Sequence, residues 1–67
     1  MIFLLDDDGL TNISRRLEDP NDGLSYVETV RSSAANREVI VLEDADWIYK
    51  IVTLNGEWCG GSQEQKA

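Results

Sequence analysis

The sequence predicts a small single α+β domain with an N-terminal strand, one or two short helices and a C-terminal three-stranded antiparallel meander. Three observations lead to this prediction. A short apolar run occupies residues 2–5, apolar residues at helical spacing follow it, and two strand-forming runs at residues 38–43 and 47–54 lead into the hairpin signal Asn55-Gly56. The prediction places the domain at residues 1–59 and a flexible C-terminal tail at residues 60–67.

The apolar run at residues 2–5 is short and ends at an acidic turn. Continuous apolar runs of this length are typical of strands buried on both faces. We therefore expect this strand to lie in the centre of a sheet.

The next segment has the pattern of an amphipathic helix. Leu10, Ile13 and Leu17 recur at helical spacing, and Thr11 is available as the N-cap. These positions predict a helix over about residues 11–18, with Arg15, Arg16 and Glu18 among the residues on its outward side.

Residues 24–35 support two interpretations. Ser25 and Glu28 fit a capping box, and Val27 and Val30 are at helical spacing, yet the same segment is rich in strand formers. We favour narrowly a helix over residues 26–35. If the segment is instead a strand, an all-β small barrel is the alternative fold.

Two strand runs, residues 38–43 and 47–54, define the C-terminal meander. The expected cross-strand pairs are Leu54 with Glu57, Thr53 with Trp58, Val52 with Cys59, Leu42 with Trp47, and Ile40 with Tyr49. Strand alternation places Ile40, Leu42, Trp47, Tyr49, Ile51 and Trp58 on one face, and Val39, Val41, Ile48, Val52, Leu54 and Cys59 on the other. Both faces are apolar, so we expect the face without a helix to meet a partner or a second copy.

Charge and residue content restrict the function. Thirteen Asp and Glu against six Lys and Arg give a net charge of −7, which repels phosphate backbones and anionic lipid and attracts basic protein surfaces. The sequence has no His, the commonest general base and zinc ligand, and its one cysteine, Cys59, cannot form an internal disulfide. No segment resembles a signal peptide or a spanning helix, so a cytoplasmic location is expected.

The acidic run after the first strand carries the main catalytic alternative. IFLLDDDGLT resembles the first motif of the haloacid-dehalogenase-like phosphatases. The resemblance implies Asp6 as nucleophile, Asp8 as acid/base, and Mg²⁺ as the ion that neutralises charge on a phosphoryl group. Leu10 stands where the family has Thr, and the later motifs of the family have no counterpart in the remaining chain.

A second resemblance covers more of the chain. The order IFLLDDD, GLTNISRRLED and VIVLED is similar to response-regulator receiver domains. It implies Asp6 and Asp7 as a metal pair and Asp44 as the phosphate acceptor. An antiparallel hairpin follows where a receiver continues with parallel strands, and the chain is too short for a doubly wound fold. We therefore interpret the run as a charged turn next to a helix N-terminus, with no metal and no cofactor.

These observations predict a non-enzymatic protein-protein interaction module. We expect it to bind or inhibit a larger protein with a basic surface, as phage and mobile-element proteins that imitate nucleic-acid charge do, without binding nucleic acid or membrane itself. The alternatives are a Mg²⁺-dependent site at Asp6 and Asp8 and a homo-oligomer, in the simplest case a homodimer. Trp47, Tyr49 and Trp58 are expected to form either a cross-strand aromatic cluster in the core or an exposed aromatic face with acids at its rim. The second interpretation defines the candidate interaction residues. They are Asp6, Asp7, Asp8, Glu43, Asp44, Asp46, Trp47, Tyr49, Glu57 and Trp58.

Overall fold

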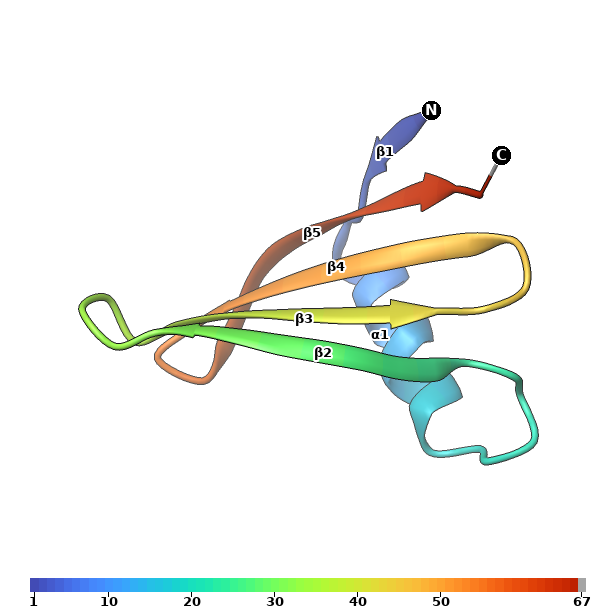
Figure 1. Cartoon of the computed structure of the whole chain (residues 1–67), viewed down its shortest axis with the longest axis horizontal. Coiled ribbons are helices and arrows are strands. Elements are labelled where there is room, and N and C mark those ends of the chain that lie inside the picture. Colours follow the sequence, from blue (N-terminus) through green and yellow to red (C-terminus); the bar gives the residue numbers. More distant parts are fainter. Residues whose placement is uncertain (67) are drawn as a thin grey trace.

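Five antiparallel strands form an open sheet with one helix on one side, in a computed structural model that describes residues 1–66 (Figure 1). The elements are β1 (Ile2–Leu4), α1 (Asp7–Leu17), β2 (Ser25–Ser32), β3 (Arg37–Glu43), β4 (Trp47–Leu54) and β5 (Glu57–Gln65). The spatial order of the strands is β1-β5-β4-β3-β2. The predicted α+β class is confirmed, with one helix and a meander of four strands.

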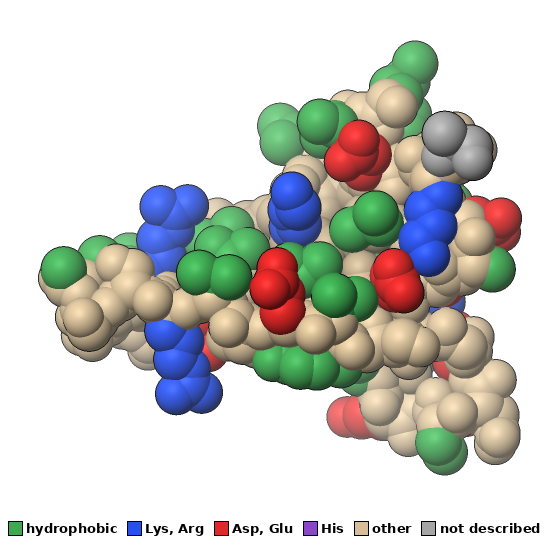
Figure 2. Space-filling view, viewed as in Figure 1, with side chains coloured by type: hydrophobic (Ala, Val, Ile, Leu, Met, Phe, Trp, Pro, Cys, Tyr) green, Lys and Arg blue, Asp and Glu red, His purple; other side chains and the backbone are tan. Residues whose placement is uncertain are grey.

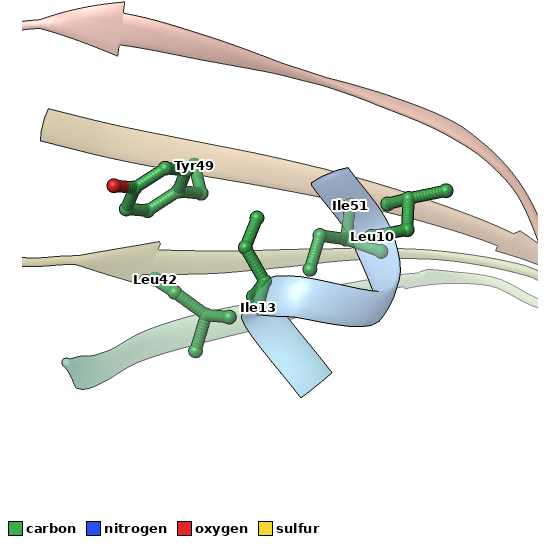
Figure 3. Packing of buried hydrophobic residues seen from close by; sticks show 5 residues of the cluster. All are labelled: Leu10, Ile13, Leu42, Tyr49 and Ile51. Carbon is green, nitrogen blue, oxygen red and sulfur yellow. The ribbon is translucent and has the colours of Figure 1, made fainter. Parts of the chain in front are cut away.

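The core lies between α1 and the middle of the sheet. In the view of Figure 1, α1 lies behind the strands. Its residues Leu10 and Ile13 face Leu42 on β3 and Tyr49 and Ile51 on β4 (Figure 3). Partly buried hydrophobic residues surround this cluster, namely Leu5, Leu24, Ile40 and Trp47. One face of the sheet is thereby covered, and no helix within residues 1–66 covers the other.

Helix α1 begins at Asp7, four residues earlier than predicted. Asp6 has extended backbone and is the N-cap, because its side chain accepts a hydrogen bond from the N–H of Gly9 at 2.8 Å. Thr11, the predicted cap, lies inside the helix, where its hydroxyl donates to the carbonyl oxygen of Asp7. No helix of the described chain is long and apolar enough to cross a membrane.

The favoured helix over residues 26–35 is wrong, because residues 25–32 form strand β2 and residues 33–36 form a turn. A bulge interrupts the pairing of β2 with β3 between Tyr26 and Glu28. The extra residue at the bulge shifts the later side chains to the opposite faces. Apolar residues therefore do not recur at every second position of this segment, which is the pattern by which a strand is predicted. The alternative barrel is also wrong, since β1 and β2 are the two edges of an open sheet.

Strand β1 is an edge strand, so the predicted central position is wrong. It contains only three residues, paired with β5, and Ile2 and Leu4 are 66% and 88% exposed. A short apolar run does not by itself distinguish a strand with two neighbours from one with a single neighbour.

The Asn55-Gly56 hairpin is confirmed, with both residues at the positive φ that its turn requires. Leu54 pairs with Glu57 and Thr53 with Trp58, as predicted, but a bulge shifts Val52 to Gly60. The predicted β3–β4 register is wrong by two residues, because Leu42 pairs with Tyr49 and Ile40 with Ile51. A shift of two preserves the faces, and the sheet residues of the core, Leu42, Tyr49 and Ile51, all belong to one of the two predicted faces.

The predicted tail from residue 60 is wrong for residues 60–65, which lie in β5 between β1 and β4. Ala67 lies outside the described residues. Gly61 fits this place because a Cβ there would lie 2.6 Å from the carbonyl oxygen of Lys50 on β4. Glycine therefore marks a close approach of two strands here, and not the end of the sheet.

Candidate interaction surfaces

The acidic run forms the N-terminus of α1. Asp6 caps the helix, and Asp7 and Asp8 lie in its first turn, where the helix dipole favours negative charge. The side chain of Asp6 is thus engaged with the backbone N–H of Gly9. Among residues 1–66, the structure brings together no group of three His, Cys, Asp or Glu side chains that could hold a metal ion.

Replacing Asp6 with alanine should lower the free energy of unfolding by about 0.5–2 kcal/mol, because the N–H of Gly9 loses its acceptor. Urea unfolding monitored by circular dichroism measures this. Asp8→Ala is the matched control, since it removes a carboxylate from the same run and keeps the cap. Equal losses in the two variants would contradict the capping role.

Arg16 is the centre of a polar cluster at the opposite end of α1. Its Nε donates to Asp22 at 2.6 Å, while Nη1 and Nη2 donate to the Tyr49 hydroxyl and to Asp44, each at 3.2 Å. The Tyr49 hydroxyl donates in turn to Asp44 at 2.9 Å. One guanidinium therefore connects the helix, the loop after it and the turn between β3 and β4.

Asp44 also organises the β3–β4 turn. Its Oδ1 accepts hydrogen bonds from the backbone N–H of Asp46 and of Trp47, at 2.8 and 2.7 Å. The side chain is only 16% exposed, so its charge depends on these donors and on Arg16. The carboxylate of Asp44 thus holds the turn together, and most of its lone pairs already accept hydrogen bonds from the protein itself.

The pKa values of the cluster follow from these contacts. Burial would raise the pKa of Asp44, but the donors from Asp46, Tyr49, Trp47 and Arg16 outweigh it and hold the pKa below its ordinary value. Burial, together with the hydrogen bond to Asp44, raises the pKa of Tyr49. The hydrogen bond to Asp22 leads the contacts that raise the pKa of Arg16. All three groups keep their usual charge at neutral pH.

Two of the three candidate aromatic residues belong to the core. Tyr49 is 6% exposed, and Trp47 packs against the core cluster. The ring of Phe3 lies 5.9 Å from that of Trp47, measured between centroids. These residues hold β1 and the sheet together, so their contacts are mainly structural.

Trp58 remains accessible, with 39% of its surface exposed. It lines a shallow hollow of about 430 Å³ beside the outer side of α1. The helix contributes Thr11, Ser14, Arg15 and Glu18 to this hollow. The hollow thus combines an aromatic ring, which can receive a Lys or Arg side chain from a partner, with one carboxylate, Glu18, and one guanidinium, Arg15.

The other candidate acids do not gather into one site. Glu43 forms an ion pair with Lys66 at 3.2 Å. Asp46 is exposed at the β3–β4 turn, and Glu57 pairs with Leu54 at the far end of the meander. The structure thus separates Asp44, Trp47 and Tyr49, which build the fold, from Trp58 and the exposed acids.

Arg16 is not among the site residues that the sequence predicts, because its position in the helix suggests the outward side. Arg16 lies three residues after Ile13 and is therefore beside the buried stripe, and this spacing was the available signal. Asp22 could not be found in this way, because its position depends on the loop that follows the helix.

Comparisons with protein-family models, with curated proteins and with solved structures give no match for this chain.

Proposed function

We propose that this protein is a non-enzymatic interaction module that binds the basic surface of a larger protein. The observation that carries the proposal is an excess of carboxylates without a basic partner. Four of the thirteen acidic side chains form ion pairs within residues 1–66, which leaves nine, whereas three of the six basic side chains are left. Such a surface attracts a basic partner and speeds the encounter.

The hollow at Trp58 supplies an anchor for this partner. Aromatic side chains at accessible hollows are common hot spots, and a Lys or Arg side chain over the indole ring would also approach Glu18. The proposed partner therefore presents a protruding cationic side chain within a basic patch. A cytoplasmic role as a regulator of a nucleic-acid-binding protein, through imitation of nucleic-acid charge, agrees with this surface.

An arginine-rich peptide is a suitable first probe. We expect it to bind more weakly as salt is raised from about 0.05 M to about 0.5 M, because screening shortens the range of the attraction. Trp58→Ala should weaken binding about fivefold to thirtyfold, the effect of losing about 1–2 kcal/mol of cation–π and contact energy. Isothermal titration calorimetry measures both effects.

Tyr26→Ala is the matched control, since Tyr26 is an exposed aromatic residue on β2 and does not line the hollow. Binding that is insensitive to salt, or that Tyr26→Ala weakens as much as Trp58→Ala, would contradict the proposal. Affinity capture with the wild type and with Trp58→Ala, at both salt concentrations, then tests natural partners.

A further inference from the structure

The sheet face away from α1 carries a row of valines. Val30 on β2 pairs with Val39 on β3, which pairs with Val52 on β4. We call these three residues the valine row. Figure 2 shows this face, where hydrophobic side chains lie among separate acidic and basic ones. Val39 and Val52 also line a shallow hollow together with Leu4 and Lys50.

Charged side chains lie on both sides of the valine row. On one side, Arg37 and Glu57 are the two cross-strand partners of Leu54. On the other side, Glu28 and Lys50 are the two partners of Val41. In the positions directly beside the row, each side therefore has one acid and one base. None of these four residues takes part in an ion pair within the described chain.

The arrangement of these charges is self-complementary. Consider a dimer whose two-fold axis runs along the valine row, at right angles to the strands. Each strand then lies over the same strand of the partner subunit, and the two run in opposite directions. The side with Arg37 then faces the side with Glu28, so that Arg37 lies next to Glu28 of the partner subunit. By the same symmetry, Lys50 lies next to Glu57 of the partner subunit, and each pair occurs twice.

We infer that this face is an interface between two copies of the chain, with the two valine rows in contact and two kinds of ion pair around them. Opposed valine rows give a dry centre, and the charges form a polar rim. The inference concerns a surface on the other side of the sheet from the Trp58 hollow and goes beyond the proposed function.

Two considerations favour a second copy in this arrangement. Stable interfaces bury about 800 Å² per partner, about one sixth of the 4833 Å² surface, and this face is the broad side of the sheet that α1 does not cover (Figure 1). A two-fold axis parallel to the strands and centred on β3 would instead oppose Arg37 to Arg37 and Glu43 to Glu43. Like charges in contact oppose association.

Charge reversal tests the interface. We expect the wild type to sediment as a dimer, and Arg37→Glu or Glu28→Arg to weaken dimerisation about tenfold or more, because symmetry repeats each repulsive contact. The double variant Arg37→Glu/Glu28→Arg should restore the dimer. Sedimentation equilibrium gives the dissociation constant of each variant, and circular dichroism checks that each is folded.

Arg31→Glu is the matched control. Arg31 lies on the other face of the sheet, the face on the side of α1, and forms an ion pair with Glu38. Its reversal changes the net charge by the same amount as Arg37→Glu. The control should leave the dimer unchanged. Three outcomes would each overturn the inference. They are a wild type that stays monomeric at about millimolar concentration, equal effects of Arg31→Glu and Arg37→Glu on dimerisation, and a double variant that does not recover the dimer. A monomeric wild type would leave this face to a different protein.

Discussion

Replacing Leu42 with alanine is expected to remove about 2–5 kcal/mol from the free energy of unfolding. Leu42 is 0% exposed and packs at the centre of the core opposite Ile13 of α1 (Figure 3). A chain of 67 residues has a total stability of about 3–10 kcal/mol, so this loss removes much of it. Urea unfolding should show a much lower midpoint or an unfolded chain.

Leu17→Ala makes the same truncation at a leucine that is 46% exposed in the last turn of α1. It should cost less than about 1 kcal/mol, since little apolar surface is lost and alanine favours the helix. A Leu42 variant no less stable than the Leu17 variant would show that the core is not where the structure places it.

Replacing Asp44 with alanine is expected to lower the free energy of unfolding by about 2–4 kcal/mol at neutral pH. The variant loses the acceptor for two backbone N–H groups and for Tyr49, and it leaves Arg16 without one of its two carboxylates. The same urea titration, repeated across acidic pH, measures the loss and its pH dependence.

The pH dependence has a definite sign. The pKa of Asp44 is lowered in the folded protein, so its stabilisation is present above the ordinary value of about 4 and is lost as pH falls through the lower folded value. The gap between wild type and Asp44→Ala should therefore narrow below about pH 4. Asp46→Ala removes a carboxylate from the same turn but keeps these hydrogen bonds, and its effect should be small. A gap that stays constant into acid would contradict this role of the Asp44 charge.

Two of the hairpins, β3–β4 and β4–β5, could be predicted because their signals are local. Asn55-Gly56 is one of the residue pairs that most strongly favour a two-residue turn, and the run before it has the residue types of a strand. The face of each side chain followed from alternation alone, and it survived a register error of two residues.

The rest could not be predicted because it depends on tertiary context. The bulge at the start of β2 made Val27 and Val30 look helical, and β5 contains glycines and polar residues that become a strand only because β1 and β4 lie on both sides. For the candidate site, the sequence could not decide which aromatic side chains are buried: Tyr49 is 6% exposed and Trp58 is 39% exposed, although both were predicted on the same face of the sheet. Tyr49 is buried because Ile13 and Leu10 of α1 pack in the same cluster, and the position of α1 over the sheet is a tertiary feature.

The pairing of β1 with β5 joins the first strand of the chain to the last. Strands β2 to β5 need only short turns to form, whereas β1 can pair only after a loop of about sixty residues closes, which has a larger entropic cost. Local contacts form faster than distant ones. We therefore expect the hairpins to assemble first and α1 with β1 to dock last, so that during folding the core face of the meander is exposed until the N-terminal segment covers it.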